Sequence, residues 1–403
     1  MEKVSEWDNQ SVPLGIYISV PFCRTKCSYC NFASDVFSRA VFERYGERVC
    51  ADIAHAQRTA AEMGGRIESQ VDSIYLGGGT PTVLEPDQLQ RMFQAVRAQF
   101  DISPGAEITV ECAPGTLAPA VLDGLVSSGV NRVSLGVQSF IDGEAAAVGR
   151  LHKRATVLED ISRLRAAGIT NLNVDLIAGL PHQTAESWRK SLDETIATGV
   201  PHVSVYMLEV DEDSRLGREL IAGGTRYHAH FVPDEEATAD FYVDATEKLE
   251  AAGIGQYEIS NFARPGFASR HNLKYWTRQP YLGFGVDAHS MLTSAASEAQ
   301  AVRFAASDSL EQYIAGAPLQ RTVVSPAAVF EESFFLGLRL NRGVDLRKIA
   351  TDFGSETLAN VRPVIAELTA AGLLQQDGDS VRLTPRGRLL SNEVFQQFLV
   401  PAS

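Results

Sequence analysis

The chain has 403 residues, 45% hydrophobic and 21% charged, which is ordinary for a globular protein long enough for two or three domains. Its formal net charge of −14 argues against a general nucleic-acid binder and against a polybasic membrane anchor. The sequence contains no run of about 18 apolar residues, so no transmembrane segment is predicted. The stretch 1–10 is polar, so no secretory signal is predicted.

One unit recurs through the first half of the chain: a short run rich in Val, Ile and Leu, then an amphipathic helical stretch. The predicted strands are Gly15–Val20, Ser73–Gly78, Glu107–Glu111, Arg132–Gln138, Leu172–Pro181 and His202–Leu208. Predicted helices between them include Pro86–Gln99, Pro119–Ser128, Ala155–Ala167 and Ala185–Thr198. Strands that are apolar on both faces and alternate with helices indicate a parallel sheet covered by helices. The predicted fold class is therefore α/β, as a partial (β/α)6 TIM-like barrel, with a doubly wound open sheet as the alternative.

Three cysteines, Cys23, Cys27 and Cys30, follow the first predicted strand with the spacing C-x3-C-x2-C, and position 32 is Phe32. A structural zinc site normally closes with four ligands, and a thioredoxin-type pair would leave Cys23 without a role. A 4Fe–4S cluster on three thiolates keeps one iron open to a small-molecule ligand, so this site is favoured. Such clustered thiols do not form a disulfide framework and predict a reducing, cytoplasmic location.

The two remaining cysteines, Cys50 and Cys112, stand alone in the sequence and are expected to be buried apolar thiols.

Polar residues follow the other predicted strands. They are the motif GGGTP (77–81), Glu111, Gln138, Asp175 and Glu209. Barrel enzymes carry their chemistry at the C-terminal ends of the strands, so these residues predict a site on that rim. The glycines of the motif would leave backbone N–H groups open to a carboxylate or amine ligand.

A predicted helix, Pro233–Ala252, leads into a mixed segment, and the last part of the chain reads as a small separate domain. Helices at Pro326–Leu340, Leu346–Phe353 and Val361–Ala371 precede a hairpin turn at Asp377–Gly378, which is typical of a winged-helix-like α+β domain. Residues 325–403 hold 8 Lys+Arg against 9 Asp+Glu, so a protein contact or a lid is expected rather than DNA binding. The predicted units are 1–235 for the barrel, 236–320 for its extension and 321–403 for the C-terminal domain.

The cysteine spacing after the first strand, with Tyr29 between the second and third cysteines, resembles the signature of the radical S-adenosylmethionine (SAM) superfamily. IYISVPFC, YLGGGTPT, VECAPGTL, SLGVQSF, GRLHKRA, NVDLIAGLP and GFGVDAHS resemble its oxygen-independent coproporphyrinogen III oxidase (HemN-like) group over residues 15–395. The resemblance implies a 4Fe–4S cluster on the three cysteines. It also implies SAM on Tyr17, Tyr29, Gly78, Gly79, Thr80, Glu111, Gln138, Arg150 and Asp175.

Two subgroups of that group differ in their markers. The oxidase has a fourth cysteine where this chain has Phe32, whereas HNLKYW, His271–Trp276, resembles the H-N-x-x-Y-W marker of HemW-type haem chaperones. The resemblance to the second subgroup implies haem on His271, because an imidazole is a good axial ligand, with Tyr275 and Trp276 offering flat apolar area. His289 in GFGVDAHS is the competing ligand.

Three functions follow from these observations. The favoured one is a haem chaperone that binds haem, the cluster and SAM and delivers haem to respiratory haem proteins, without coproporphyrinogen oxidase activity. The alternative is the oxidase, which decarboxylates two propionates of coproporphyrinogen III through a 5′-deoxyadenosyl radical. A zinc-stabilised scaffold that binds partners through its winged domain is the third. Whether SAM is cleaved, whether the chain dimerises and whether a partner brings it to a membrane are left open.

Overall fold

The computed structural model describes residues 12–296 and 300–399. The stretch 1–10, from which no secretory signal is predicted, lies outside the described residues, as do the outer ends of the predicted units 1–235 and 321–403.

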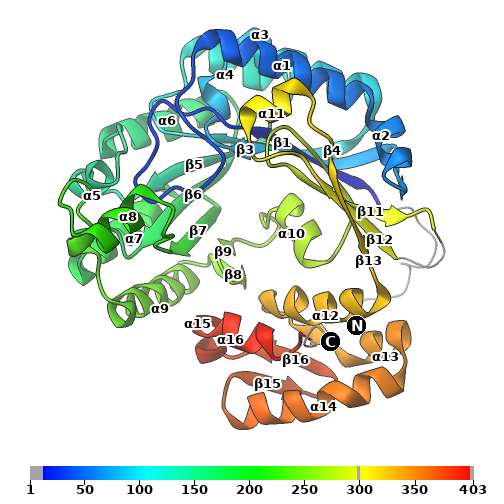
Figure 1. The fold of residues 1–403 in the computed structure, drawn as a ribbon. Helices are drawn as coiled ribbons and strands as arrows, with labels where there is room; N and C mark the ends of the chain where they lie inside the picture. The colour runs from blue at the N-terminus through cyan, green and yellow to red at the C-terminus, as the bar shows by residue number, and fades with distance from the viewer. Residues whose placement is uncertain (1–11, 297–299, 400–403) are drawn as a thin grey trace.

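Six parallel strands form the centre of one large curved sheet (Figure 1). They are β1 (Leu14–Val20), β3 (Gln70–Gly78), β4 (Asp101–Cys112), β5 (Arg132–Gln138), β6 (Asn171–Ala178) and β7 (His202–Met207). Their order in the sheet follows their order in the chain. A doubly wound sheet would reverse direction at a switch point, so the partial barrel is confirmed and the alternative is wrong.

Helices cover the outer side of this sheet (Figure 1). They are α1 (Arg39–Ala54), α2 (Ala56–Glu62), α3 (Pro86–Gln99), α4 (Pro119–Ser127), α5 (Asp142–Ala147), α6 (Arg154–Ala166), α7 (Ala185–Thr198) and α9 (Glu235–Ala251). Helix α8 (Arg215–Ala222) is instead bonded to the loop that follows β1. The four helices predicted between the strands are confirmed to within one residue at each end. Apolar side chains between these helices and the strands form the main core.

Further strands extend the sheet at both edges. Beyond β1 lie β10 (Tyr281–Phe284), which is parallel to β1, then β11 (His289–Ser294), β12 (Ala301–Ala305) and β13 (Gln320–Val324). The short strand β2 (Gly65–Arg66) pairs with β11. Beyond β7 lie β9 (Asn261–Ala263) and β8 (Gly255–Glu258). The two outer edges, β13 and β8, do not pair with each other, so the barrel is open on one side. The short helix α10 (Arg270–Trp276), which carries HNLKYW, lies on the concave side of the sheet (Figure 1).

The expectation that the strands are apolar on both faces is wrong. Only the residues facing the helices are apolar, whereas Arg132, Ser134, Asn173 and His202 are buried polar side chains on the alternate positions of three neighbouring strands. These alternate positions face the concave interior, where polar groups hydrogen-bond one another and α10 supplies further polar partners. The interior of the barrel is therefore polar, unlike a covered parallel sheet.

The C-terminal domain has its own apolar core. Its elements are α12 (Pro326–Phe335), β14 (Val344–Asp345), α13 (Leu346–Phe353), α14 (Ser355–Ala370), β15 (Leu374–Asp377), β16 (Ser380–Leu383), α15 (Pro385–Leu389) and α16 (Ser391–Gln396). The order of three helices and a hairpin is as predicted. The helix predicted to begin at Val361 begins earlier, at Ser355. Pro363 lies inside this helix, although a proline usually marks a helix boundary.

Short elements complete the described chain. Three-residue 3-10 helices lie at Pro81–Val83, Ala229–Phe231 and Gly337–Arg339, and helix α11 spans Leu310–Ala315. The membrane-spanning criterion of length and apolar character is met by no helix among the described residues.

Candidate functional site

The cysteine loop between β1 and α1 is held at the C-terminal rim of the barrel by backbone bonds from three directions. The N–H of Thr80 donates to the carbonyl of Phe22 at 2.8 Å, that of Ser28 to Val148 at 3.1 Å, and that of Leu216 to Ser28 at 2.8 Å. Thr80 follows β3, Val148 comes after β5, and Leu216 lies in the first turn of α8. The loop therefore has a fixed place beside the other strand ends.

The three loop cysteines each have a polar neighbour at the sulfur. The hydroxyl of Thr80 donates to the Sγ of Cys23 at 3.7 Å, and Arg150 donates to the Sγ of Cys27 at 3.6 Å. Burial raises the pKa of the Cys23 thiol, although the bond from Thr80 opposes the shift, and burial likewise raises the pKa of Cys30. Thiols in such surroundings become thiolates when a metal centre supplies the compensating positive charge.

Among the described residues, no group of three or more His, Cys, Asp and Glu side chains has the spacing that a single metal ion requires. A zinc site needs such a group, whereas a 4Fe–4S cluster offers a separate iron to each thiolate. Three free thiols on one loop fit the three thiolate ligands of such a cluster.

All five cysteines are free thiols. Cys112 is buried in the main core, where burial raises its pKa to about 12, and Cys50 packs against the same core. The prediction of a buried thiol is confirmed for Cys112, whereas Cys50 is only partly buried.

Two backbone N–H groups of the glycine motif are bonded within the protein, whereas the sequence predicts that they are open to a ligand. The N–H of Gly78 donates to the Oε2 of Glu111 at 3.1 Å, and the N–H of Thr80 is bonded to Phe22, so neither is open to a ligand. A Cβ on Gly79 would lie 2.6 Å from the carbonyl oxygen of Val20 and 2.9 Å from backbone atoms of Phe22. The glycines therefore allow the cysteine loop to pack closely on the end of β3.

Two half-buried carboxylates, Glu111 and Asp175, face the interior below this rim. Glu111 accepts a hydrogen bond from the Tyr75 hydroxyl at 2.8 Å, and Asp175 accepts bonds from Ser134 at 2.9 Å and Asn173 at 2.7 Å. Burial, with the charge of Asp175 adding to it, raises the pKa of Glu111 to about 7 despite the bond from Tyr75. Burial also raises the pKa of Asp175. Two half-buried carboxylates that lie close together favour a cationic ligand.

Gln138 ends β5 in a left-handed conformation, with φ of 67°, which is unusual for a residue other than glycine. Its Oε1 is a buried acceptor with no hydrogen-bond partner in the described part of the chain. Local strain and an unused acceptor at a strand end are typical of a ligand contact.

Arg150 joins the cysteine loop to β5, because its guanidinium donates to the carbonyl of Gly136 as well as to Cys27. Tyr29 packs on the apolar cluster of Val148, Ile177 and Leu180, so it closes the same side of the loop.

Tyr17 stacks on Tyr75 with ring centroids 6.2 Å apart, and a Cβ on Gly78 would lie 3.1 Å from the Tyr17 hydroxyl. The rim residues predicted as one site therefore do come together, whereas Glu209 is an exposed side chain beyond β7.

The HNLKYW motif lies deeper than a surface ligand site. His271 is 1% exposed, its Nδ1 lies 3.1 Å from the Ser73 hydroxyl, and its Nε2 lies 2.9 Å from the Tyr275 hydroxyl. Burial, with Lys274 and Arg132 contributing, lowers its pKa to about 3. The imidazole is therefore neutral, but both of its nitrogens are engaged within the barrel.

Of the aromatic pair of the motif, Trp276 contacts the C-terminal domain and Tyr275 contacts strand β10 of the barrel. The guanidinium of Arg339 lies 4.3 Å from the centroid of the Trp276 ring, and Tyr275 packs edge-on against Tyr281 at 4.7 Å. The competing ligand, His289, has a side chain that is 67% exposed and lies 3.7 Å from a carboxylate oxygen of Asp287.

Tyr75 is the residue that sequence reasoning misses most clearly. Its hydroxyl holds Glu111, and its ring stacks on His271 with centroids 5.3 Å apart, so it connects the predicted SAM and haem residues. Asn173 is missed too, although it bonds Ser134, Ser204 and Asp175 together. The available signal was the alternation of polar residues along β3, β5, β6 and β7.

Comparison with family models matches residues 17–195 to the Radical SAM superfamily and residues 324–390 to the HemN C-terminal domain. A radical SAM family match implies a 4Fe–4S cluster and SAM.

Among curated relatives, the chain is 33% identical over 392 residues to "Heme chaperone HemW" of Lactococcus lactis, covering 96% of this chain and 98% of the relative. It is 34% identical over 390 residues to the protein of that name from Bacillus subtilis, covering 95% and 98%. Among solved structures, the coproporphyrinogen III oxidase HemN of Escherichia coli, a radical SAM enzyme, superposes with a TM-score of 0.80 and 24% identity. That match covers 96% of this chain and 90% of the oxidase, and at this identity it carries the fold alone.

Proposed function

The chain belongs to the HemW family of the radical SAM superfamily, and from that premise we propose that it is a cytoplasmic haem chaperone that binds haem, a 4Fe–4S cluster and SAM. It hands haem to respiratory haem proteins. The observation that carries the proposal is at least 30% identity to HemW relatives over nearly the whole length of both chains.

The described rim fits a cluster and SAM. Three thiols lie on a loop fastened to the barrel, two half-buried carboxylates face the interior, and the Oε1 of Gln138 has no donor among the described residues. We propose that Glu111 and Asp175 face the cationic portion of SAM, that Gln138 accepts from a ribose hydroxyl, and that Arg150 holds the loop. When bound and reduced, the cluster can supply one electron to the sulfonium.

One feature argues against the oxidase as the alternative. The fourth position of the cysteine motif is Phe32, a side chain 63% exposed beside the loop. In the oxidase group a cysteine is expected there, so this chain lacks a thiol that the alternative calls for.

The affinity for SAM is expected to fall about tenfold between pH 8 and pH 6, because Glu111, with a pKa raised to about 7, becomes protonated and no longer attracts a cation. Anaerobic equilibrium dialysis with labelled SAM measures this. Glu111→Gln, which stays neutral throughout, should bind weakly at both pH values and flatten the profile. An unchanged affinity of the wild type across this range would remove Glu111 from the site.

For the haem iron we propose His271, which is already in the neutral form that ligates metals. Ligation requires α10 to leave its present position, because both imidazole nitrogens are bonded to neighbouring hydroxyls. Haem uptake should therefore be slow, and His271→Ala should shift the Soret maximum of the haem complex. His289→Ala is the matched control, since that side chain is exposed and outside the barrel interior. A shift in the control variant alone would move the ligand to His289.

The function itself is tested on anaerobically reconstituted protein divided between two assays. Haem titration is expected to saturate with a Soret band, and coproporphyrinogen III with SAM and a reductant is expected to yield no protoporphyrinogen IX. Turnover to protoporphyrinogen without haem binding would establish the alternative.

A further inference from the structure

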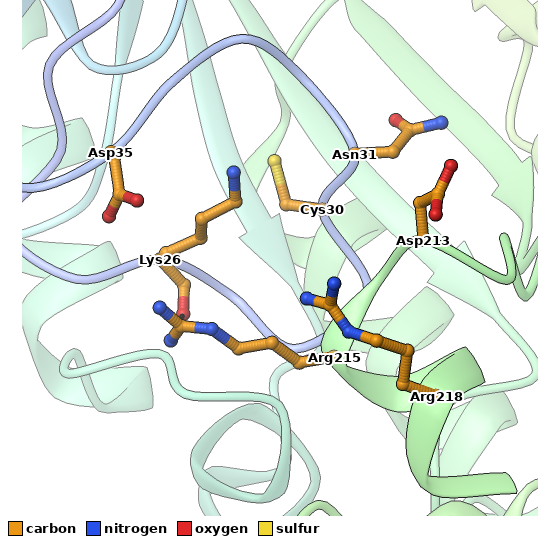
Figure 2. Close-up of a pocket in the computed structure, with 7 residues that line it drawn as sticks. All are labelled: Lys26, Cys30, Asn31, Asp35, Asp213, Arg215 and Arg218. Atoms are coloured by element: carbon orange, nitrogen blue, oxygen red, sulfur yellow. Dashed lines mark hydrogen bonds between the residues drawn. The ribbon is translucent and has the colours of Figure 1, made fainter.

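A cavity of about 170 Å³ lies beside the cysteine loop, and Cys30 lines it (Figure 2). Three cations, Lys26, Arg215 and Arg218, line the same cavity, together with the carboxylates of Asp35 and Asp213. Figure 2 shows Lys26 entering from the cysteine loop and both arginines entering from α8. The cavity is therefore built from two elements that meet next to one of the three cluster cysteines.

Two of the three cations are held in place by backbone carbonyl groups. Lys26 donates to the carbonyl of Phe32 at 3.3 Å, and Arg215 donates to the carbonyl of Lys26 at 3.3 Å. Within the described ranges, none of the three cations forms an ion pair with a carboxylate, and the side chain of Arg218 has no hydrogen-bond partner. This is so although two carboxylates line the same cavity, where apart from Cys30 the lining holds three cations and two carboxylates.

The position of the arginines follows from the helix. Residues three apart share a helix face, so Arg215 and Arg218 point the same way. The first turn of α8 is fastened to the cysteine loop by the bond from the Leu216 N–H to the Ser28 carbonyl, 2.8 Å long. A change in the cysteine loop would therefore move the arginines with it.

Two exposed apolar side chains are close in the chain to residues that line this cavity. Phe32, whose carbonyl holds Lys26, is 63% exposed, and Ile221, one turn after Arg218 on α8, is 70% exposed. Cations beside exposed apolar side chains suit a ligand that has carboxylates at one edge and a flat apolar body.

We propose that this cavity receives the propionate carboxylates of haem, with the macrocycle lying against Phe32 and Ile221. The inference rests on the proposed function and names the site at which the cargo docks. Guanidinium groups bind carboxylates with two parallel hydrogen bonds. Docking here uses groups that are already open at the surface, whereas the imidazole of His271 becomes available only when α10 moves.

The test compares haem with its dimethyl ester, in which both carboxylates are blocked, by Soret titration of the full cluster-loaded protein. The wild type is expected to bind haem at least about fivefold more tightly than the ester, which is the worth of one charge-assisted hydrogen bond at a partly exposed site. Arg218→Ala should remove most of that preference by weakening haem and leaving the ester unchanged. Arg218→Lys should retain part of it.

Lys190→Ala, which removes an exposed cation from α7, is the control and should keep the full preference. The iron content of each variant shows that the cysteine loop is intact. Equal affinity of the wild type for haem and ester, or an equal loss of both in Arg218→Ala, would overturn the carboxylate site and leave the chaperone proposal standing. A wild type that binds neither porphyrin would overturn both.

Discussion

Replacing Cys27 with alanine is expected to reduce the iron and labile sulfide of anaerobically reconstituted protein from about four of each per chain to near background. Cys27 is the most buried of the loop cysteines, at 8% exposure, and Arg150 lies against its sulfur. With three protein ligands at the cluster, the loss of one leaves two irons without a thiolate. The broad absorption near 400 nm should disappear together with the iron.

Cys50→Ala provides the matched control, because this cysteine lies on α1 and packs against the core rather than in the loop. It should retain the full iron content. If Cys27→Ala kept its iron, or if Cys50→Ala lost it, the cluster would not be on the predicted loop.

Gly79→Ala is expected to destabilise the fold by about 3 kcal/mol and to lower the iron content as well. The new methyl group would lie 2.6 Å from the carbonyl oxygen of Val20 and 2.9 Å from backbone atoms of Phe22. Backbone atoms cannot move away as a flexible side chain can, so the end of β1 and the cysteine loop must shift together. Urea unfolding of the apo-protein and iron analysis after reconstitution measure the two effects.

Gly143→Ala makes the same chemical change on α5, where a new Cβ would meet nothing within 4 Å. It should leave iron unchanged and unfolding neutral or slightly favourable, because alanine has the higher helix propensity. Equal stability of the two variants would show that the glycine motif does not hold the loop.

Much of the barrel could be predicted because its signals are local. Each of the six strands contains a short run rich in Val, Ile and Leu, and the helices predicted between them have the expected boundaries. The cysteine loop could be predicted equally well, since C-x3-C-x2-C lies within eight positions directly after a strand.

The interior of the barrel could not be predicted in the same way, because its contacts join residues far apart in the chain. The bonds of His271 to Ser73 and of His202 to Asn173 span 198 and 29 positions. The alternation of polar residues along β5 and β6 was visible, but runs rich in Val and Leu masked it. The burial of His271 depends on where α10 lies, and no local pattern specifies that position.

The cationic cavity beside Cys30 was missed for a related reason. Arg215 and Arg218 follow the last barrel strand in a helix that the sequence analysis did not predict, almost 190 positions after Lys26. Only the packing of α8 on the cysteine loop brings these charges together.

The central claim, that the chain carries haem in order to deliver it, is tested most directly by a transfer measurement. Haem-loaded, cluster-containing protein is mixed with a haem-free respiratory haem protein, and the absorbance change is followed against the rate of spontaneous haem loss to apomyoglobin. Transfer is expected to be faster than spontaneous loss, and its rate is expected to rise with the acceptor concentration. Transfer no faster than spontaneous loss at every acceptor concentration would contradict the claim.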